Sequence, residues 1–122
     1  MRTWAVKSVG VRPLTVNALV NLHRMAWAQH TAQTRSDWCW LARAARVQPC
    51  EAVELTVTPL HKDRRSPQDV AACAPEAKAA IDGLVDAGLI PDDSPAHLLC
   101  VTFLPPVICG EDGMAIDIRE VA

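Results

Sequence analysis

The sequence contains no apolar run long enough to cross a bilayer, which takes about 20 residues as a helix. Its first residues, MRTWAVKSVGVRP, also lack the uninterrupted apolar segment of a secretory signal. No internal repeat or low-complexity tract is visible, and 50% of the 122 residues are hydrophobic, which is typical of a folded globular domain. We therefore expect a single domain over residues 1–122 with no membrane association, located in the cytoplasm of a bacterial host.

A close pair of cysteines, which a structural zinc site would need, is also absent. His97 and Cys100 are the only tight Cys/His neighbours in the sequence. An odd number of widely spaced cysteines predicts reduced thiols that are mostly buried. The five cysteines are Cys39, Cys50, Cys73, Cys100 and Cys109.

The chain also lacks the basic excess that is usual for domains that wrap DNA, because its formal net charge is −2. Positive charge is instead concentrated in two segments. Such clusters suit either a DNA-facing patch on a weakly acidic protein or the solvated faces of helices and loops. They consist of Arg35, Arg43 and Arg46 in the first segment, and of Lys62, Arg64 and Arg65 in the second.

Hydrophobic periodicity predicts an α/β (α+β) fold. Strands are expected over residues 3–9, 51–60, 97–104 and 114–121, the last two as an antiparallel pair. Helices are expected over 18–30, over 34–47 with Ser36 as a candidate N-cap, and from residue 74 or 75 to 87, where Gly88 ends the helix. The expected order is β-α-β-α-β-β, with the helices packed on a mixed sheet of about four strands.

Two tryptophans separated by one residue, Trp38 and Trp40, are expected to point to nearly opposite sides of one helix. One of them could lie at a dimer contact or stack on distorted DNA, and packing against a neighbouring strand is the alternative. His23, Trp27 and His30 share one helical face. Because no third ligand lies near the two histidines, this face indicates packing rather than metal binding.

The stretch from His61 to Asp93 concentrates the residues that could do chemistry. A basic cluster opens it, Asp69 follows, and a helical segment carrying Lys78 leads to the pair Asp92 and Asp93. Hydrolysis of a phosphodiester uses Mg²⁺ or a similar hard cation, whose natural ligands are carboxylate oxygens. Over residues 53–93, and most specifically in AKAAIDGLVDAGLIPDD, this layout resembles the RusA family of Holliday-junction endonucleases.

The resemblance implies a Mg²⁺-dependent endodeoxyribonuclease, with Mn²⁺ as an alternative ion, that acts on branched DNA as a symmetric homodimer. It implies that Asp69 and Asp93 bind the metal with support from Asp92, and that Lys78 contacts phosphate. Asp69, Lys78 and Asp93 would then form the catalytic set. The resemblance also implies that a basic cluster contacts the DNA backbone, here Lys62, Arg64 and Arg65.

The sequence departs from the Asp-x-Asp-Asn step of that family. Asp69 matches the first Asp, but Ala71 and Ala72 stand where the second Asp and the Asn are expected. No carboxylate occurs between Asp69 and Glu76, although Glu76 could reach the ion in compensation. Because loss of a ligand should cost at least about 10 to 100-fold in metal affinity or activity, we expect weak or absent cleavage.

Each part of the pattern also has a structural interpretation. Asp69 could cap a helix, Asp92 and Asp93 could form a turn, and Lys78 could be a solvated helix residue. A second hypothesis is therefore a non-catalytic module that holds DNA without cutting it or contacts a protein partner instead. The incomplete motif and the negative net charge favour this second hypothesis. An unrelated small α/β protein is the third.

Overall fold

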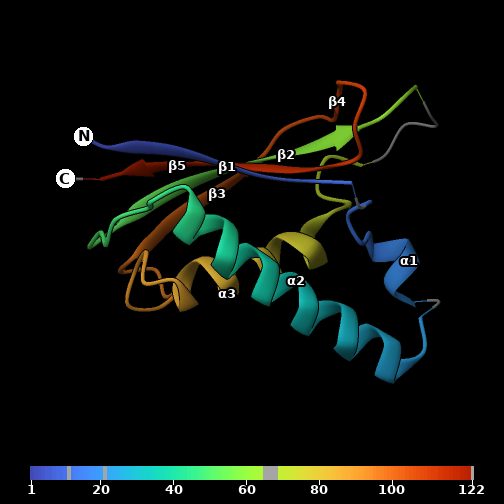
Figure 1. The fold of residues 1–122 in the computed structure, drawn as a ribbon, viewed down its shortest axis with the longest axis horizontal. Helices are drawn as coiled ribbons and strands as arrows, with labels where there is room; N and C mark the ends of the chain where they lie inside the picture. Colours follow the sequence, from blue (N-terminus) through green and yellow to red (C-terminus); the bar gives the residue numbers. More distant parts are fainter. Residues whose placement is uncertain (11, 21, 65–68, 122) are drawn as a thin grey trace.

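The computed structural model describes residues 1–10, 12–20, 22–64 and 69–121. It has an α+β fold in which helices cover one face of a five-stranded mixed sheet (Figure 1). The fold class predicted from the sequence is confirmed. The order of elements is β-α-α-β-α-β-β-β, which differs from the expected order by two helices in place of one before the second strand and by an additional two-residue strand.

The sheet has the strand order β1-β5-β2-β3, and β4 pairs with the end of β2. Its central strand β2 alternates between buried and partly exposed side chains, as the sequence predicts, with Val53, Leu55 and Val57 facing the helices. The open face carries mainly polar side chains such as Thr56 and Asp117. The strands are β1 (Thr3–Val9), β2 (Val53–His61), β3 (Leu98–Phe103), β4 (Val107–Ile108) and β5 (Gly113–Glu120).

The expected antiparallel pairing of the last two long strands is wrong. Strand β3 pairs with β2 in parallel, and β5 lies between β1 and β2, antiparallel to both. The helix between β2 and β3 carries the chain back across the sheet, so that β3 runs in the same direction as β2. The segment after β3 then crosses the end of β2, and β5 pairs along the other side of β2.

The helices are α1 (Val16–Val20), α2 (Arg24–Ala44) and α3 (Ala74–Asp86). Two separate helices over 18–30 and 34–47 were expected, but α2 is continuous, with His23 as N-cap and Ser36 inside the helix. No Gly or Pro interrupts residues 24–44, and the packing of Thr34 and Trp38 outweighs the low helix propensity of the polar residues between them. Within the described residues, no helix has the length and apolar character needed to cross a membrane.

Helix α3 lies close to the backbone of α2, and both lie on the same side of the sheet (Figure 1). A Cβ added at Gly83 would overlap the Arg35 carbonyl oxygen and approach Trp38 Cβ to 2.9 Å. Glycine therefore allows this close approach of the two helices. The buried indole of Trp38 and the side chain of Leu84 fill the core beside it.

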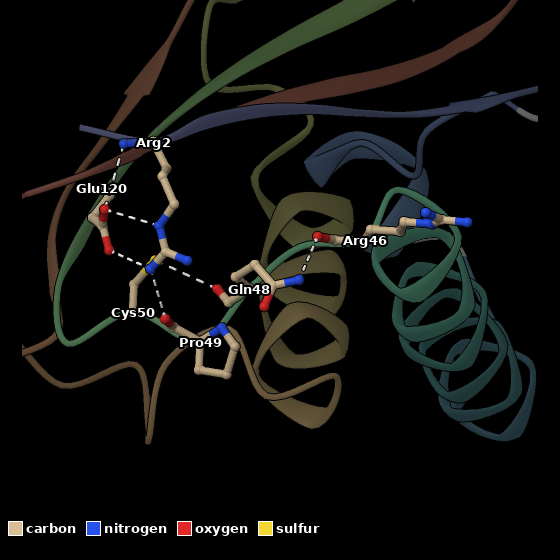
Figure 2. A network of polar contacts seen from close by, with 6 residues as sticks. All are labelled: Arg2, Arg46, Gln48, Pro49, Cys50 and Glu120. Atoms are coloured by element: carbon tan, nitrogen blue, oxygen red, sulfur yellow. Dashed lines mark hydrogen bonds and ion pairs between the residues drawn. The ribbon is translucent and has the colours of Figure 1, made fainter.

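Helix α2 ends through a residue with left-handed backbone geometry. Arg46 has a φ of 57°, in the region where glycine is usual after a helix. The Val47 amide donates to the Ala42 carbonyl oxygen at 3.1 Å, and the Gln48 side-chain amide donates to the Arg46 carbonyl oxygen (Figure 2). This turn directs the chain from α2 toward β2.

The first and last long strands are joined to the segment that precedes β2. Figure 2 shows Arg2 extending between Glu120 and Pro49–Cys50. The Arg2 guanidinium donates to both Glu120 carboxylate oxygens, at 3.1 and 2.6 Å, and to the Pro49 carbonyl oxygen at 3.0 Å. The hydrogen bonds from Arg2 lower the pKa of Glu120 from 4.5 to about 2. The Arg2 guanidinium thus joins three segments, and the ionised carboxylate of Glu120 is one of its acceptors.

Candidate functional site

Lys78 and Asp93, which the sequence places 15 residues apart, meet in the structure. Lys78 Nζ donates to Asp93 Oδ2 at 2.5 Å and to Asp82 Oδ1, one turn further along α3, at 2.9 Å. The hydrogen bond to Asp93 is the main reason that the pKa of Lys78 is raised, and the Lys78 ammonium lowers the pKa of Asp93. Lys78 and Asp93 are therefore charged at neutral pH, and the side chains of Asp82 and Asp93 both contact the one ammonium.

The turn after α3 brings Asp93 back to the helix. Gly88 has a φ of 93°, which glycine adopts without strain, and its amide donates to the Val85 carbonyl oxygen at 2.9 Å. Leu89 and Ile90 are then buried in the core. Anchoring these two apolar side chains returns the chain along α3, so that Asp93 reaches the second turn of the helix.

Asp92 has a local structural role. Its Oδ1 accepts the Ser94 backbone N–H at 2.9 Å, a side-chain turn that is common for Asp. Hydrogen bonding from Ser94 lowers the pKa of Asp92. The geometry matches the interpretation of Asp92 as a turn residue, and its carboxylate points into the turn.

Asp69 lies in an exposed turn before α3. Its carbonyl oxygen accepts the Ala72 N–H at 2.9 Å, and the N-cap position of α3 belongs to Cys73, whose side chain makes no capping bond. The interpretation of Asp69 as the helix cap is therefore wrong. Ala71, at the position of the expected second Asp, is exposed, so that a carboxylate there would point into solvent.

The carboxylates expected to share a metal ion do not form a ready ligand set. In the part of the chain that the structure describes, no three side chains of His, Cys, Asp or Glu gather where they could hold a metal. Asp82 and Asp93 both bind the Lys78 ammonium, which occupies the space between them. Of the expected metal ligands, Asp93 contacts the Lys78 ammonium, Asp92 accepts the Ser94 amide, and Asp69 lies in the turn before α3.

The basic cluster follows the end of β2. Lys62 and Arg64 are exposed, the Lys62 backbone N–H donates to Asp112 Oδ1 at 3.0 Å, and Arg65 lies outside the described residues. The loop after α3, which carries Asp93, lies toward the other end of the sheet (Figure 1). The exposed residues of the cluster thus present positive charge at one end of the molecule.

Glu76 is held inside the protein. Its Oε2 accepts hydrogen bonds from the Leu14 backbone N–H at 2.9 Å and from His30 Nε2 at 2.7 Å, and its Oε1 accepts from the Thr34 hydroxyl at 3.2 Å. The residue is 8% exposed. With its oxygens bound to these donors, the carboxylate does not face Asp93, and the suggestion that it replaces the missing ligand is wrong.

The network of Glu76, His30, Thr34 and Leu14 was not predicted from the sequence. Two signals were present: His30 and Thr34 are four residues apart on one helical face, and Glu76 lies on the apolar stripe of α3 beside Ala77 and Ala80. An acidic residue on a buried stripe requires donors from another element. The sequence does not reveal which element supplies them.

Trp38 and Trp40 do point to opposite sides of α2, as predicted. Trp38 is 1% exposed and Trp40 is 67% exposed. The Arg43 guanidinium lies 5.6 Å from the centroid of the Trp40 ring, a cation–π distance. The outer face of α2 therefore offers an aromatic ring and a positive charge together.

A scan against models of known protein families found no match for this sequence, and a search of curated proteins found no significant one.

Proposed function

We propose that this chain is a RusA-like protein that binds branched DNA, with the Holliday junction as its substrate class, and in which cleavage is weak or lost. The observation that supports this most directly is the contact between Lys78 and Asp93 at 2.5 Å. Lys78 and Asp93 are two of the three matched residues, with Asp92, in the most specific part of the resemblance. The resemblance implies a lysine within a helix and an acidic pair just after it, and here the lysine lies beside one carboxylate of that pair.

Weak cleavage follows from the charges around Lys78. Its ammonium already binds Asp82 and Asp93, so little positive charge is left for the developing charge on phosphate. The position of the missing ligand is the exposed Ala71. Binding does not require these groups, because Lys62 and Arg64 are exposed beyond the end of β2 and can contact the DNA backbone. A two-fold symmetric junction suits a homodimer.

The experiment compares binding and cleavage of a synthetic four-way junction, with Mg²⁺ and with Mn²⁺, for the chain and for the double variant Ala71→Asp with Ala72→Asn. We expect junction binding by both forms and increased cleavage by the double variant. Asp93→Asn should remove any cleavage, and unchanged cleavage in this variant would exclude Asp93 from the site.

The binding surface is tested by salt dependence. Lys62→Ala and Arg64→Ala should each lower the slope of log affinity against log salt by about 0.9, one phosphate contact each. Arg119→Ala, which removes an exposed positive charge from β5 opposite the start of β2, is the matched control and should leave the slope unchanged. Equal effects of all three substitutions would refute a defined surface at the basic cluster.

A second candidate function is a module that binds a protein. Met25 is 66% exposed and Trp40 is 67% exposed on α2, and large exposed apolar side chains are typical of protein interfaces. This alternative would be favoured if neither the chain nor its double variant bound junction DNA more tightly than an unbranched duplex.

A further inference from the structure

A hollow of about 260 Å³ lies where the segment before α1 meets α2, α3 and the end of β2. The basic side chains that line it are Arg12, His30 and His61, and no acidic side chain is among its described lining residues. Pro13, Leu14, Ala18 and Pro59 form the apolar part of its wall, and Thr15 and Cys73 complete it. The hollow thus combines basic groups with an apolar surface.

His30 is held in place in this hollow. Its Nε2 donates to Glu76 Oε2 at 2.7 Å, and in that tautomer Nδ1 can accept a hydrogen bond from another partner. The Thr15 hydroxyl accepts the Ala18 backbone N–H at 3.2 Å and keeps its own proton to donate. Both side chains are therefore positioned by the fold and retain a polar atom for a ligand.

The two other basic residues differ in burial. His61 is 7% exposed, whereas the Arg12 side chain is 67% exposed and lies 3.8 Å from Asp112. A weak contact at that distance leaves the Arg12 guanidinium able to turn toward the hollow. The Arg12 guanidinium carries a permanent positive charge, and imidazole rings can exchange hydrogen bonds with a ligand.

We infer that this hollow binds a phosphomonoester carried on a small organic group, such as the sugar of a nucleotide. The Arg12 guanidinium and the His61 imidazole receive the phosphate oxygens, the Thr15 hydroxyl donates a further hydrogen bond, and His30 Nδ1 accepts one from a hydroxyl of the organic group. The hollow is larger than a single phosphate needs, and its apolar wall suits a sugar or base. His61 leads directly into Lys62, so the hollow adjoins the basic cluster.

Two sources carry this chemistry: a phosphate at the end of a nucleic-acid strand, and a free mononucleotide. The inference does not require the proposed junction-binding function. The experiment measures binding to the full chain by calorimetry with deoxyadenosine monophosphate, deoxyadenosine, and a short oligonucleotide with a 5′-phosphate or a 5′-hydroxyl. Preference for the phosphorylated form supports the inference, and the tighter of the two phosphorylated probes identifies the source. Equal binding of each phosphorylated probe and its unphosphorylated form overturns it.

Substitutions locate the site. Arg12→Ala should weaken binding of deoxyadenosine monophosphate about tenfold or more, as expected for a hydrogen bond to a charged group. His61→Asn should do the same, and its thermal unfolding must match that of the wild type. Arg24→Ala removes the same charge from the exposed start of α2 and is the matched control. If Arg12→Ala and Arg24→Ala weaken binding equally, the attraction is non-specific and the inference fails.

Junction binding by the same variants separates this inference from the proposed function. A chain that binds the nucleotide but no junction would refute the proposed function and leave the hollow as assigned. A chain that binds the junction, with no preference for phosphate in the calorimetric test, would refute the hollow alone.

Discussion

The buried carboxylate of Glu76 gives the sharpest test of the packing. It accepts from Leu14 N, His30 Nε2 and Thr34 Oγ1, and so joins α3 to α2 and to the segment before α1. Glu76→Ala leaves these donors without their acceptor in a site that is almost closed to water. The substitution is therefore expected to loosen the contact among all three segments.

The expected loss of stability follows from how deeply the hydrogen-bond donors to Glu76 are buried. Leu14 and Thr34 are 9% and 6% exposed, and each buried donor left unsatisfied costs about 1–3 kcal/mol. Thr34 can turn its hydroxyl toward a carbonyl oxygen of its own helix, which reduces its share. We expect Glu76→Ala to lower the free energy of unfolding by about 3–5 kcal/mol, as for other broken buried pairs. Glu76→Gln should cost about 1–2 kcal/mol, because its carbonyl oxygen can still accept two of the hydrogen bonds.

Urea unfolding followed by circular dichroism measures both changes. With a slope of about 1–3 kcal/mol per molar urea, Glu76→Ala should shift the midpoint by about 2 M. Asp82→Ala removes a partly exposed carboxylate from the same helix and should change stability by about 0.5 kcal/mol or less. If the loss in free energy of unfolding for Glu76→Ala were within about 1 kcal/mol of the loss for Asp82→Ala, the reasoning on the buried network would be refuted.

Three further substitutions test the close approach of the two helices at Gly83, the left-handed backbone of Arg46, and the ion pair of Arg2 with Glu120 in Figure 2. Gly83→Ala should destabilise the protein by about 1–3 kcal/mol despite the better helix propensity of alanine, because its methyl group would overlap the Arg35 carbonyl oxygen; an unchanged urea midpoint would contradict this. Arg46→Gly should raise the free energy of unfolding by about 0.5–1 kcal/mol, since glycine adopts a φ of 57° without strain, and a lower melting temperature would argue against it. Glu120, with a pKa lowered from 4.5 to about 2 by Arg2, contributes stability that is present above pH 4.5 and is lost as the pH falls toward 2. Glu120→Gln should flatten that part of the pH–stability curve, and an identical curve would exclude the contribution.

The sequence predicted which segments form strands better than it predicted how they pair. Alternation in residues 51–60 identified β2, and the apolar stripe of residues 74–87 identified α3. Alternation reveals which face of a strand is buried, but it does not name the neighbouring strand. The place of β5 between β1 and β2 therefore could not be read from residues 114–121 alone.

Local sequence patterns were also limited in predicting the helix boundaries and the contacts at the site. A helix ending at residue 30 and a second one with Ser36 as its N-cap were expected, but packing of Trp38 and Thr34 against α3 keeps α2 continuous. The contact of Lys78 with Asp93 agrees with the expected pattern, because one helix and its turn bring the two together. The Glu76 network links segments far apart in the sequence, and such contacts depend on the tertiary fold. Local periodicity places Glu76 on a buried stripe, but it does not identify the donors that bind its carboxylate.

The pairing of β1 with β5 places Thr3 opposite Arg119, and Arg2 binds Glu120 beside them. Because these two positions are already neighbours, a short linker between them would add little strain. A permuted form of residues 2–120, joined at these positions and opened at an exposed loop, would keep every strand pairing that the structure describes. Fluorophores attached near residues 2 and 120 would sit at one edge of the molecule, away from the hollow beside His30.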